Sequence, residues 1–148
     1  MQQHYLIPWA GLAFWELGQI WFCQIVVYPL FAMVGEKDYV PYHHFYVSHI
    51  PAPVIVPGFA CFLLPLALPF LGPAAIPPLL HGLNIALGFV GLMVTVFLEI
   101  PRHGRLEREG KDPHVIGQLI RYNWPRTASI SLQAVVAAWM LTYIFATA

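Results

Sequence analysis

Hydrophobic residues form four long runs along this chain, separated by short connections of polar residues, glycine and proline. The runs cover about residues 6–34, 45–71, 79–100 and 124–146. Each is long enough to cross the roughly 30 Å of hydrocarbon in a bilayer, for which a helix needs about 20 residues. The pattern predicts an all-α protein with one domain, residues 1–148. Its four transmembrane helices are expected to run up and down as an antiparallel bundle.

The second run contains prolines close to its start. Pro51, Pro53 and Pro57 follow a connection in which residues 42–49 are expected to form about two helical turns. Proline removes a helix hydrogen bond, and its ring crowds the preceding turn. We therefore expect the second span to be bent by its prolines, or divided into two helices, near that end.

Composition supports a membrane protein. The chain has 148 residues, of which 59% are hydrophobic and only 9% are charged, whereas about a quarter of the residues in a soluble domain are charged. Cys23 and Cys61 lie in different apolar runs and form no CxxC pair. They are expected to be buried small hydrophobic residues rather than a thiol-disulfide centre. The expected partner of the chain is the lipid bilayer.

Positive charge is unevenly distributed. Six of the seven Lys and Arg residues lie between Arg102 and Arg126, and the seventh is Lys37. Under the positive-inside rule these segments face the cytoplasm, as in a protein of a bacterial inner membrane, and both termini lie on the other side. No basic patch lies away from the membrane edge, so nucleic-acid binding is not expected.

Polar residues inside the spans suggest an internal site. Glu16, Gln19 and Cys23 are spaced i, i+3 and i+7, which predicts one face of the first helix. A carboxyl group inside a span is costly unless it is protonated, paired or hydrated, so Glu16 is expected to face the bundle interior. It is either a neutral group hydrogen-bonded to a neighbouring helix or a functional one.

Antiparallel threading brings further polar residues to the same end of the bundle. Glu99, His103, Asn123 and Arg126 lie at the cytoplasmic ends of the third and fourth runs. An apolar pocket with a few converging polar groups is the usual form of a small-molecule site. We expect such a pocket, open to the cytoplasm, for a lipophilic small molecule.

Three interpretations of these residues remain open at this point. A metal site for iron or copper could use histidines of the first connection and the third span, although HExxH and ExxH motifs are absent. Without a cofactor, a His or Glu could deprotonate an acidic aromatic substrate while Arg126 and Asn123 stabilise the oxyanion. In the third interpretation Arg126 and Glu99 form a structural ion pair and the histidines lie among the lipid headgroups. The candidate metal ligands are His43, His44, His49 and His103.

Three segments resemble the anthrone-oxygenase-like family of small four-span membrane proteins. They are VVYPLFA at residues 26–32, TVFLEIPRHGRL at 95–106 and YNWPRT at 122–127. The resemblance implies a four-helix membrane fold and the oxidation of polycyclic aromatic anthrones to quinones by dioxygen without a cofactor. His103 stands where the family usually has Asn, and the histidines at 43, 44 and 49 are additional. The positions that match the family are Pro29, Pro101, Asn123, Arg126 and Thr127.

The sequence thus predicts a small membrane oxidoreductase or oxygenase that acts on a lipophilic aromatic or quinone-like molecule. The alternatives are a non-catalytic subunit, within a homo-oligomer or a larger membrane complex, and a metal-binding membrane protein. The predicted catalytic residues are Glu16, Glu99, His103, Asn123 and Arg126.

Overall fold

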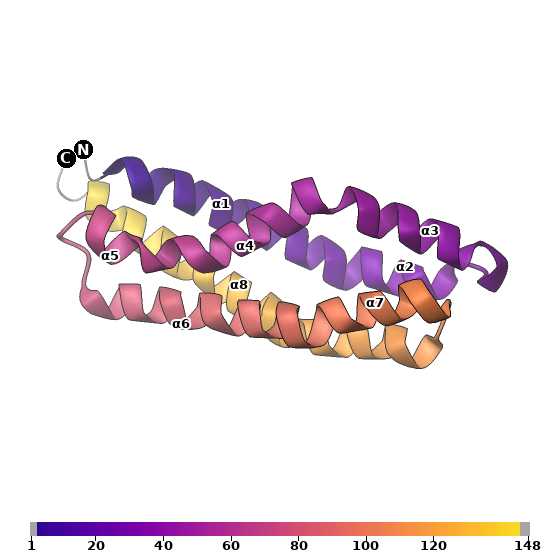
Figure 1. Cartoon of the computed structure of the whole chain (residues 1–148). Coiled ribbons are helices and arrows are strands. Elements are labelled where there is room, and N and C mark those ends of the chain that lie inside the picture. The colour runs from indigo at the N-terminus through magenta and orange to yellow at the C-terminus, as the bar shows by residue number, and fades with distance from the viewer. Residues whose placement is uncertain (1–2, 146–148) are drawn as a thin grey trace.

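The computed structural model describes the backbone of residues 3–145 and the side chains of residues 5–144. These residues form helices and no strand. The chain makes four antiparallel passes, so the start of the first helix and the end of the last lie at the same end of the bundle (Figure 1). The all-α prediction is confirmed.

Three of the four passes are interrupted helices. The first consists of α1 (Gln3–Phe22), a π-helical turn η1 (Cys23–Val27) and α2 (Tyr28–Met33). The second consists of α3 (Glu36–His49), a π-helical turn η2 (Pro51–Ile55), α4 (Val56–Leu63), a 3₁₀ turn η3 (Leu64–Leu66) and α5 (Leu68–Leu71). The third consists of α6 (Pro78–Val94), a π-helical turn η4 (Thr95–Glu99) and α7 (Ile100–Glu109), and the fourth is α8 (Pro113–Phe145).

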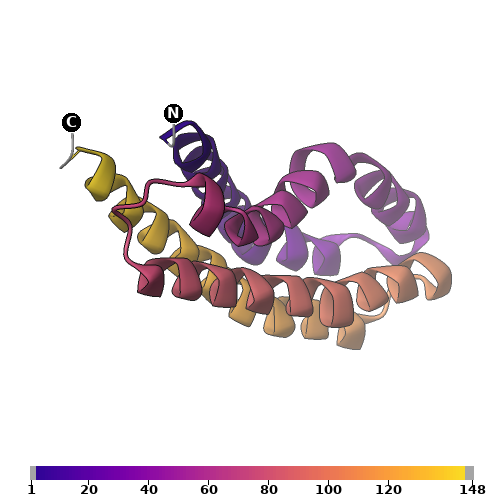
Figure 2. The same ribbon diagram turned by 60° about the vertical axis from the view of Figure 1, so that its left-hand side comes forward.

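The helices are long and apolar enough to cross a membrane. Tyr5–Met33, Pro78–Glu109 and Pro113–Ile144 qualify singly, and Glu36–His49 with Pro51–Leu66 qualifies as a pair bent by 49°. The structure therefore has three candidate spans, or four if the bent pair counts as one. The second pass rises to a peak at this bend in both views (Figure 1 and Figure 2). This confirms the prediction of a proline-bent second segment.

Helix boundaries differ from those predicted at the charged end of the bundle. The second pass is helical from Glu36 rather than from residue 45, and the third continues past Pro101 to Glu109. The fourth begins at Pro113 instead of 124, and its predicted end at residue 146 lies outside the described residues. These extra turns are amphipathic. They bury an apolar cluster of Tyr28, Phe31, Tyr39, Leu106, Val115, Ile116 and Leu119.

The remaining loop between α7 and α8 is short and well capped. Gly110 ends α7 with a φ of 83°, a left-handed conformation that favours glycine. The Asp112 carboxylate accepts hydrogen bonds from the backbone N–H groups of Val115 at 3.2 Å and His114 at 2.8 Å. These bonds hold the pKa of Asp112 below its ordinary value. Arg105 Nη2 lies 3.1 Å from the same carboxylate, which fixes α7 against the start of α8.

Buried polar residues occupy the middle of the bundle, between two apolar clusters. One cluster packs α1, α4, α5, α6 and the end of α8, and includes Leu6, Trp9, Leu80 and Met140. The other is the cluster at the charged end described above. Between these clusters along α1, η1, η4 and α8 lie buried Glu16, Gln24, Thr95, Glu99, Asn123, Arg126, Thr127 and Gln133.

Candidate functional site

Arg126 of α8 is the central group of this polar layer. Its side chain is buried, with 8% of its surface exposed, and its Nη1 donates to Thr95 Oγ1 at 3.4 Å. Its Nε has no hydrogen-bond partner within the described structure. Two buried carboxyl groups, Glu16 from α1 and Glu99 from η4, interact electrostatically with the guanidinium.

The two carboxyl groups are only partly satisfied. In the described part of the chain, Glu16 Oε1 and both oxygens of Glu99 are buried without a hydrogen-bond partner. The direct Arg126–Glu99 ion pair considered above is therefore not formed. Unpaired buried polar atoms are rare in proteins because each costs about 1–3 kcal/mol. The layer thus holds donor and acceptor atoms that remain available to another molecule.

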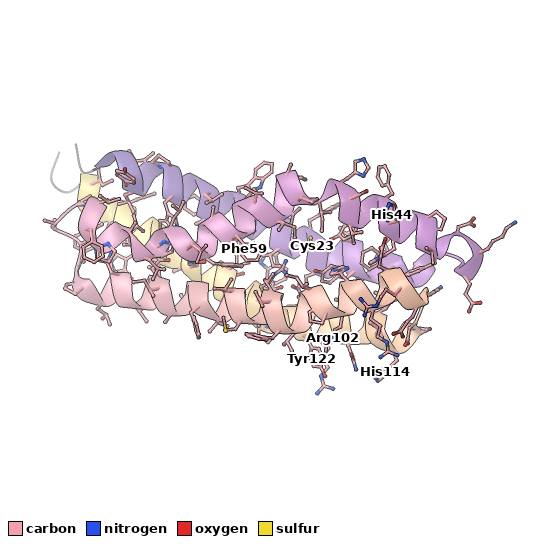
Figure 3. All side chains as sticks on the ribbon, viewed as in Figure 1. Cys23, His44, Phe59, Arg102, His114 and Tyr122 are labelled. Atoms are coloured by element: carbon pink, nitrogen blue, oxygen red, sulfur yellow. The ribbon has the colours of Figure 1, made fainter. Side chains whose placement is uncertain are left out.

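A small cavity opens beside these groups, under the bend of the second pass. It has about 250 Å³ of empty volume, of which about 20 Å³ can hold the centre of a water molecule. This is space for about one water. Gly58 of α4 lines the cavity beside Glu16, where a Cβ would stand at an ordinary contact distance of 3.4 Å from Glu16 Oε2. Figure 3 labels Phe59 and Cys23 at this level of the bundle. The cavity is lined by Glu16, Val54, Ile55, Gly58, Phe59, Phe62, Thr95 and Arg126.

All three π-helical turns supply residues to this region. In each turn a backbone N–H bonds to the carbonyl five residues earlier: Tyr28 to Cys23, Val56 to Pro51 and Ile100 to Thr95. Residues of η2 line the cavity, η4 supplies Thr95 and Glu99, and η1 supplies buried Cys23 and Gln24. Such turns are rare and are frequent at functional sites.

A proline explains the position of each π turn. Pro29, Pro57 and Pro101 each stand two residues after the end of the turn. A proline ring in a helix clashes with the carbonyl four residues earlier. That carbonyl belongs to the central residue of each π turn: Ile25, Pro53 and Phe97. Widening the turn relieves the clash and avoids the hydrogen bond that proline cannot donate. The prolines were visible in the sequence, but their relation to the site was not predicted.

The structure brings together three of the predicted catalytic residues, Glu16, Glu99 and Arg126. Asn123 lies in the same buried layer but does not line the cavity. Its Nδ2 donates to Gln24 Oε1 at 2.8 Å in a network that joins α8 to η1, and its Oδ1 has no hydrogen-bond partner within the described residues. Gln19 is half-exposed, and it faces an outer surface with Trp15 and Phe22. The prediction that Gln19 shares the buried face of Glu16 is therefore wrong, since three residues turn a helix by only about 300° and leave it at the edge.

The predicted histidine cluster is only partly assembled. His43 is fully buried, and its Nδ1 lies 2.9 Å from Glu107 Oε2 while its Nε2 lies 3.1 Å from His103 Nδ1. His44 Nδ1 lies 2.5 Å from Glu107 Oε1. His49 is exposed and separate, with its Nδ1 2.7 Å from the carbonyl oxygen of Phe45 in its own helix.

These side chains bond to one another rather than converging on one point. Among the residues that the structure describes, no group of three or more His, Cys, Asp or Glu could hold a metal ion. The proposed set of His43, His44, His49 and His103 is thus not arranged as a metal centre. Glu107 was missed because the third helix was predicted to end at about residue 100. The i, i+4 spacing of Glu99, His103 and Glu107 would have revealed it in a helix that continues past Pro101.

The three motifs that carry the family resemblance lie around this layer. Residues 26–32 end η1 and form most of α2, residues 95–106 form η4 and most of α7, and residues 122–127 lie within α8. The resemblance itself stays a prediction. Comparison of the chain with protein-family models, with curated proteins and with solved structures gives no match.

Proposed function

We propose that this chain is an integral-membrane oxidoreductase or oxygenase that acts on a lipophilic aromatic or quinone-like molecule at the Arg126 cavity. The observation that carries the proposal is a buried guanidinium with an unpaired Nε, beside two buried carboxyl groups with unpaired oxygens, all within the described residues. The apolar walls of Val54, Ile55, Phe59 and Phe62 suit an aromatic ring. The resemblance to anthrone oxygenases points to the same class of substrate.

The proposed chemistry is a proton abstraction from a ring carbon that is conjugated with a ketone through aromatic rings. Arg126 donates to the ketone oxygen, and the Glu16 carboxylate accepts a proton from the acidic CH2 group, which in an anthrone lies across the central ring from the ketone. The resulting oxyanion is stabilised by the guanidinium in a site that holds little water. Asn123 is given no part in this step, because it does not line the cavity and its Nδ2 donates to Gln24. In the reaction of an anthrone with dioxygen, two C–H bonds break, one oxygen atom becomes the new carbonyl and the other leaves as water.

Substrate entry requires the second pass to move outward. The cavity holds about one water molecule, far less than a polycyclic ring needs. Pro51, Pro53 and Pro57 have no N–H group to donate, so the backbone across η2 has few hydrogen bonds to lose when the bend opens. The proposal therefore assigns η2 and the start of α4 as the moving wall of the site.

Turnover in a bilayer tests this proposal. The purified protein in lipid nanodiscs, supplied with anthrone in air, is expected to accelerate dioxygen uptake over empty nanodiscs. Arg126→Gln and Glu16→Gln should each lower this rate by about 100-fold or more, because each removes a charge that acts in the reaction. The readout is the oxygen-electrode trace together with the absorbance of the quinone product.

Arg121→Gln is the matched control for Arg126→Gln. Arg121 lies on the same helix but is exposed, so its neutral variant should keep the wild-type rate. The non-catalytic alternative predicts that the two Arg variants and the wild type behave alike, with no acceleration in any of them. That outcome would remove the catalytic proposal.

A further inference from the structure

A chain of hydrogen-bonded side chains runs from the charged end of the bundle toward the buried layer. Its outer part is Glu107, with 30% of its side chain exposed, next to His44, with 69% exposed. Figure 3 shows His44 of α3 near the charged end of the bundle. From Glu107 the chain passes to His43, which is fully buried, then to His103, which is partly exposed, and then to buried Tyr28.

The two imidazoles have the same orientation along the chain of hydrogen bonds. Glu107 Oε2 lies 2.9 Å from His43 Nδ1, and His43 Nε2 lies 3.1 Å from His103 Nδ1. His103 Nε2 in turn lies 3.5 Å from the hydroxyl oxygen of Tyr28. Each ring thus faces its outer neighbour with Nδ1 and its inner neighbour with Nε2. A neutral imidazole with one N–H and one bare nitrogen can take up a proton on one side and release one on the other.

Packing holds these rings in place. His43 stacks on Tyr39 with centroids 5.7 Å apart and on His103 with centroids 5.4 Å apart. Phe31 of α2 contacts both imidazoles edge-on, at 5.4 Å and 6.0 Å between centroids. The rings therefore cannot swing into solvent without breaking the apolar cluster at the charged end.

The inner end of the chain reaches the catalytic layer. The Tyr28 hydroxyl interacts electrostatically with Arg126 and Glu99, and both oxygens of Glu99 lack a hydrogen-bond partner within the described structure. The ionisable groups that face Glu99 from other elements are Tyr28 of α2, Arg102 of α7 and Arg126 of α8. Glu99 is thus an unpaired acceptor that Tyr28 faces.

We propose that Glu107, His43, His103 and Tyr28 form a proton relay between the aqueous phase at the charged end and Glu99 in the buried layer. One proton enters at the Glu107 carboxylate, each imidazole passes on its opposite N–H proton, and the Tyr28 hydroxyl proton moves to the Glu99 carboxylate. Every intermediate group regains its original composition, and the Glu99 carboxylate becomes a carboxylic acid. The inference that the reaction at Arg126 uses this proton rests on the proposed function. The proton path from Glu107 to Glu99 does not depend on it.

Time-resolved infrared spectroscopy tests the relay without any substrate. Protein in membranes receives a light-triggered pH drop from a caged proton, and the C=O band of a protonated buried carboxyl group is followed. Loss of the band in Glu99→Gln assigns it. Tyr28→Phe removes one hydroxyl group and keeps the ring, and it is expected to slow the appearance of the band by about 100-fold, as the loss of a positioned acid or base does. Glu107→Gln and His43→Phe should slow it similarly.

Two variants serve as controls. Tyr42→Phe also removes a hydroxyl group from a ring that packs on Phe31, and His49→Ala removes a histidine of α3 that lies outside the chain of hydrogen bonds. Both should leave the rate unchanged. A wild-type rate in Tyr28→Phe, or a wild-type protein in which no Glu99-dependent band responds, would overturn the relay. If anthrone is not turned over but the Glu99-dependent band still responds, the proposed function is wrong and the relay stands.

Discussion

At Gly88 of α6 the side chain is a single hydrogen atom because α4 passes directly over it. A Cβ there would stand 2.9 Å from the carbonyl oxygen of Phe62 and 3.4 Å from its Cα, both backbone atoms, and 3.1 Å from Gln133 Nε2. A Cβ at Gly88 can be accommodated only if α4 and α6 move apart. We expect Gly88→Ala to lower the free energy of unfolding by about 1–3 kcal/mol, as overpacking does. Denaturation by SDS in mixed micelles measures this change.

Gly82 on the same helix provides the comparison. A Cβ at Gly82 would meet nothing within 4 Å, so Gly82→Ala should stabilise the helix by about 0.5–1 kcal/mol through its better helix propensity. If the two Ala variants unfold together, the close contact between α4 and α6 is wrong. Both glycines lie in α6, and only the packing distinguishes them.

The sequence could reveal a site residue where burying its side chain inside a membrane span has a high free-energy cost. Glu16, Glu99 and Arg126 were predictable because an ionisable group inside a span must face the protein interior. The roles of Asn123 and Glu107 were not predictable in the same way. Asn123 is uncharged, so its amide N–H can donate to any neighbouring acceptor, here Gln24 Oε1. Glu107 required knowledge that the helix continues past a proline.

At the scale of elements, the prolines that follow the π turns set the orientation of the helices beyond them. A π turn holds one more residue than an α turn, so it rotates all later residues by about 100° relative to a regular helix. In the third pass this rotation presents His103 of α7 to His43 of α3. The other two π turns act in the same way. In the first pass η1 orients α2, and in the second pass η2 positions the wall of the cavity.

Pro101→Ala tests this role. The alanine introduced at this position can donate its N–H to the carbonyl of Phe97, which would convert η4 to α-helix and turn His103 away from His43. We expect the variant to lose the fast infrared response and anthrone turnover by about 100-fold, with no loss of thermal stability because one hydrogen bond is gained. Pro8→Ala is the control, since Pro8 lies within α1 and no π turn precedes it in the described residues. Wild-type rates in Pro101→Ala would show that the proline does not maintain the turn.

The existence of the elements could be predicted, but not their interruptions. Hydrophobic runs predicted all four passes, because burial in lipid demands a continuous apolar surface. They predicted helices that are too short at the charged end, where α7 and the start of α8 are polar except for one apolar face that includes Leu106 and Leu119. No residue pattern distinguishes a π turn from a kink, so the bend of the second pass was predicted and the turns were not.

At the scale of the whole molecule, the charged groups lie at one end and the relay begins there. His114, at the start of α8, marks this end in Figure 3, and the connection at residues 72–77 lies at the opposite end in Figure 1. The relay can take protons only from the compartment that this end faces. The side of the membrane that supplies the site is therefore decided by the orientation of the bundle.

Cysteine labelling determines that orientation. His114→Cys and Ala75→Cys place exposed thiols at the two ends and leave every Lys and Arg in place. The native Cys23 and Cys61 are buried and add little background. By the positive-inside rule, a membrane-impermeant maleimide should label only Ala75→Cys in intact cells and only His114→Cys in inverted vesicles. The reverse pattern would make the outer compartment the proton source, and labelling of both from one side would mean that the chain does not cross the membrane between them.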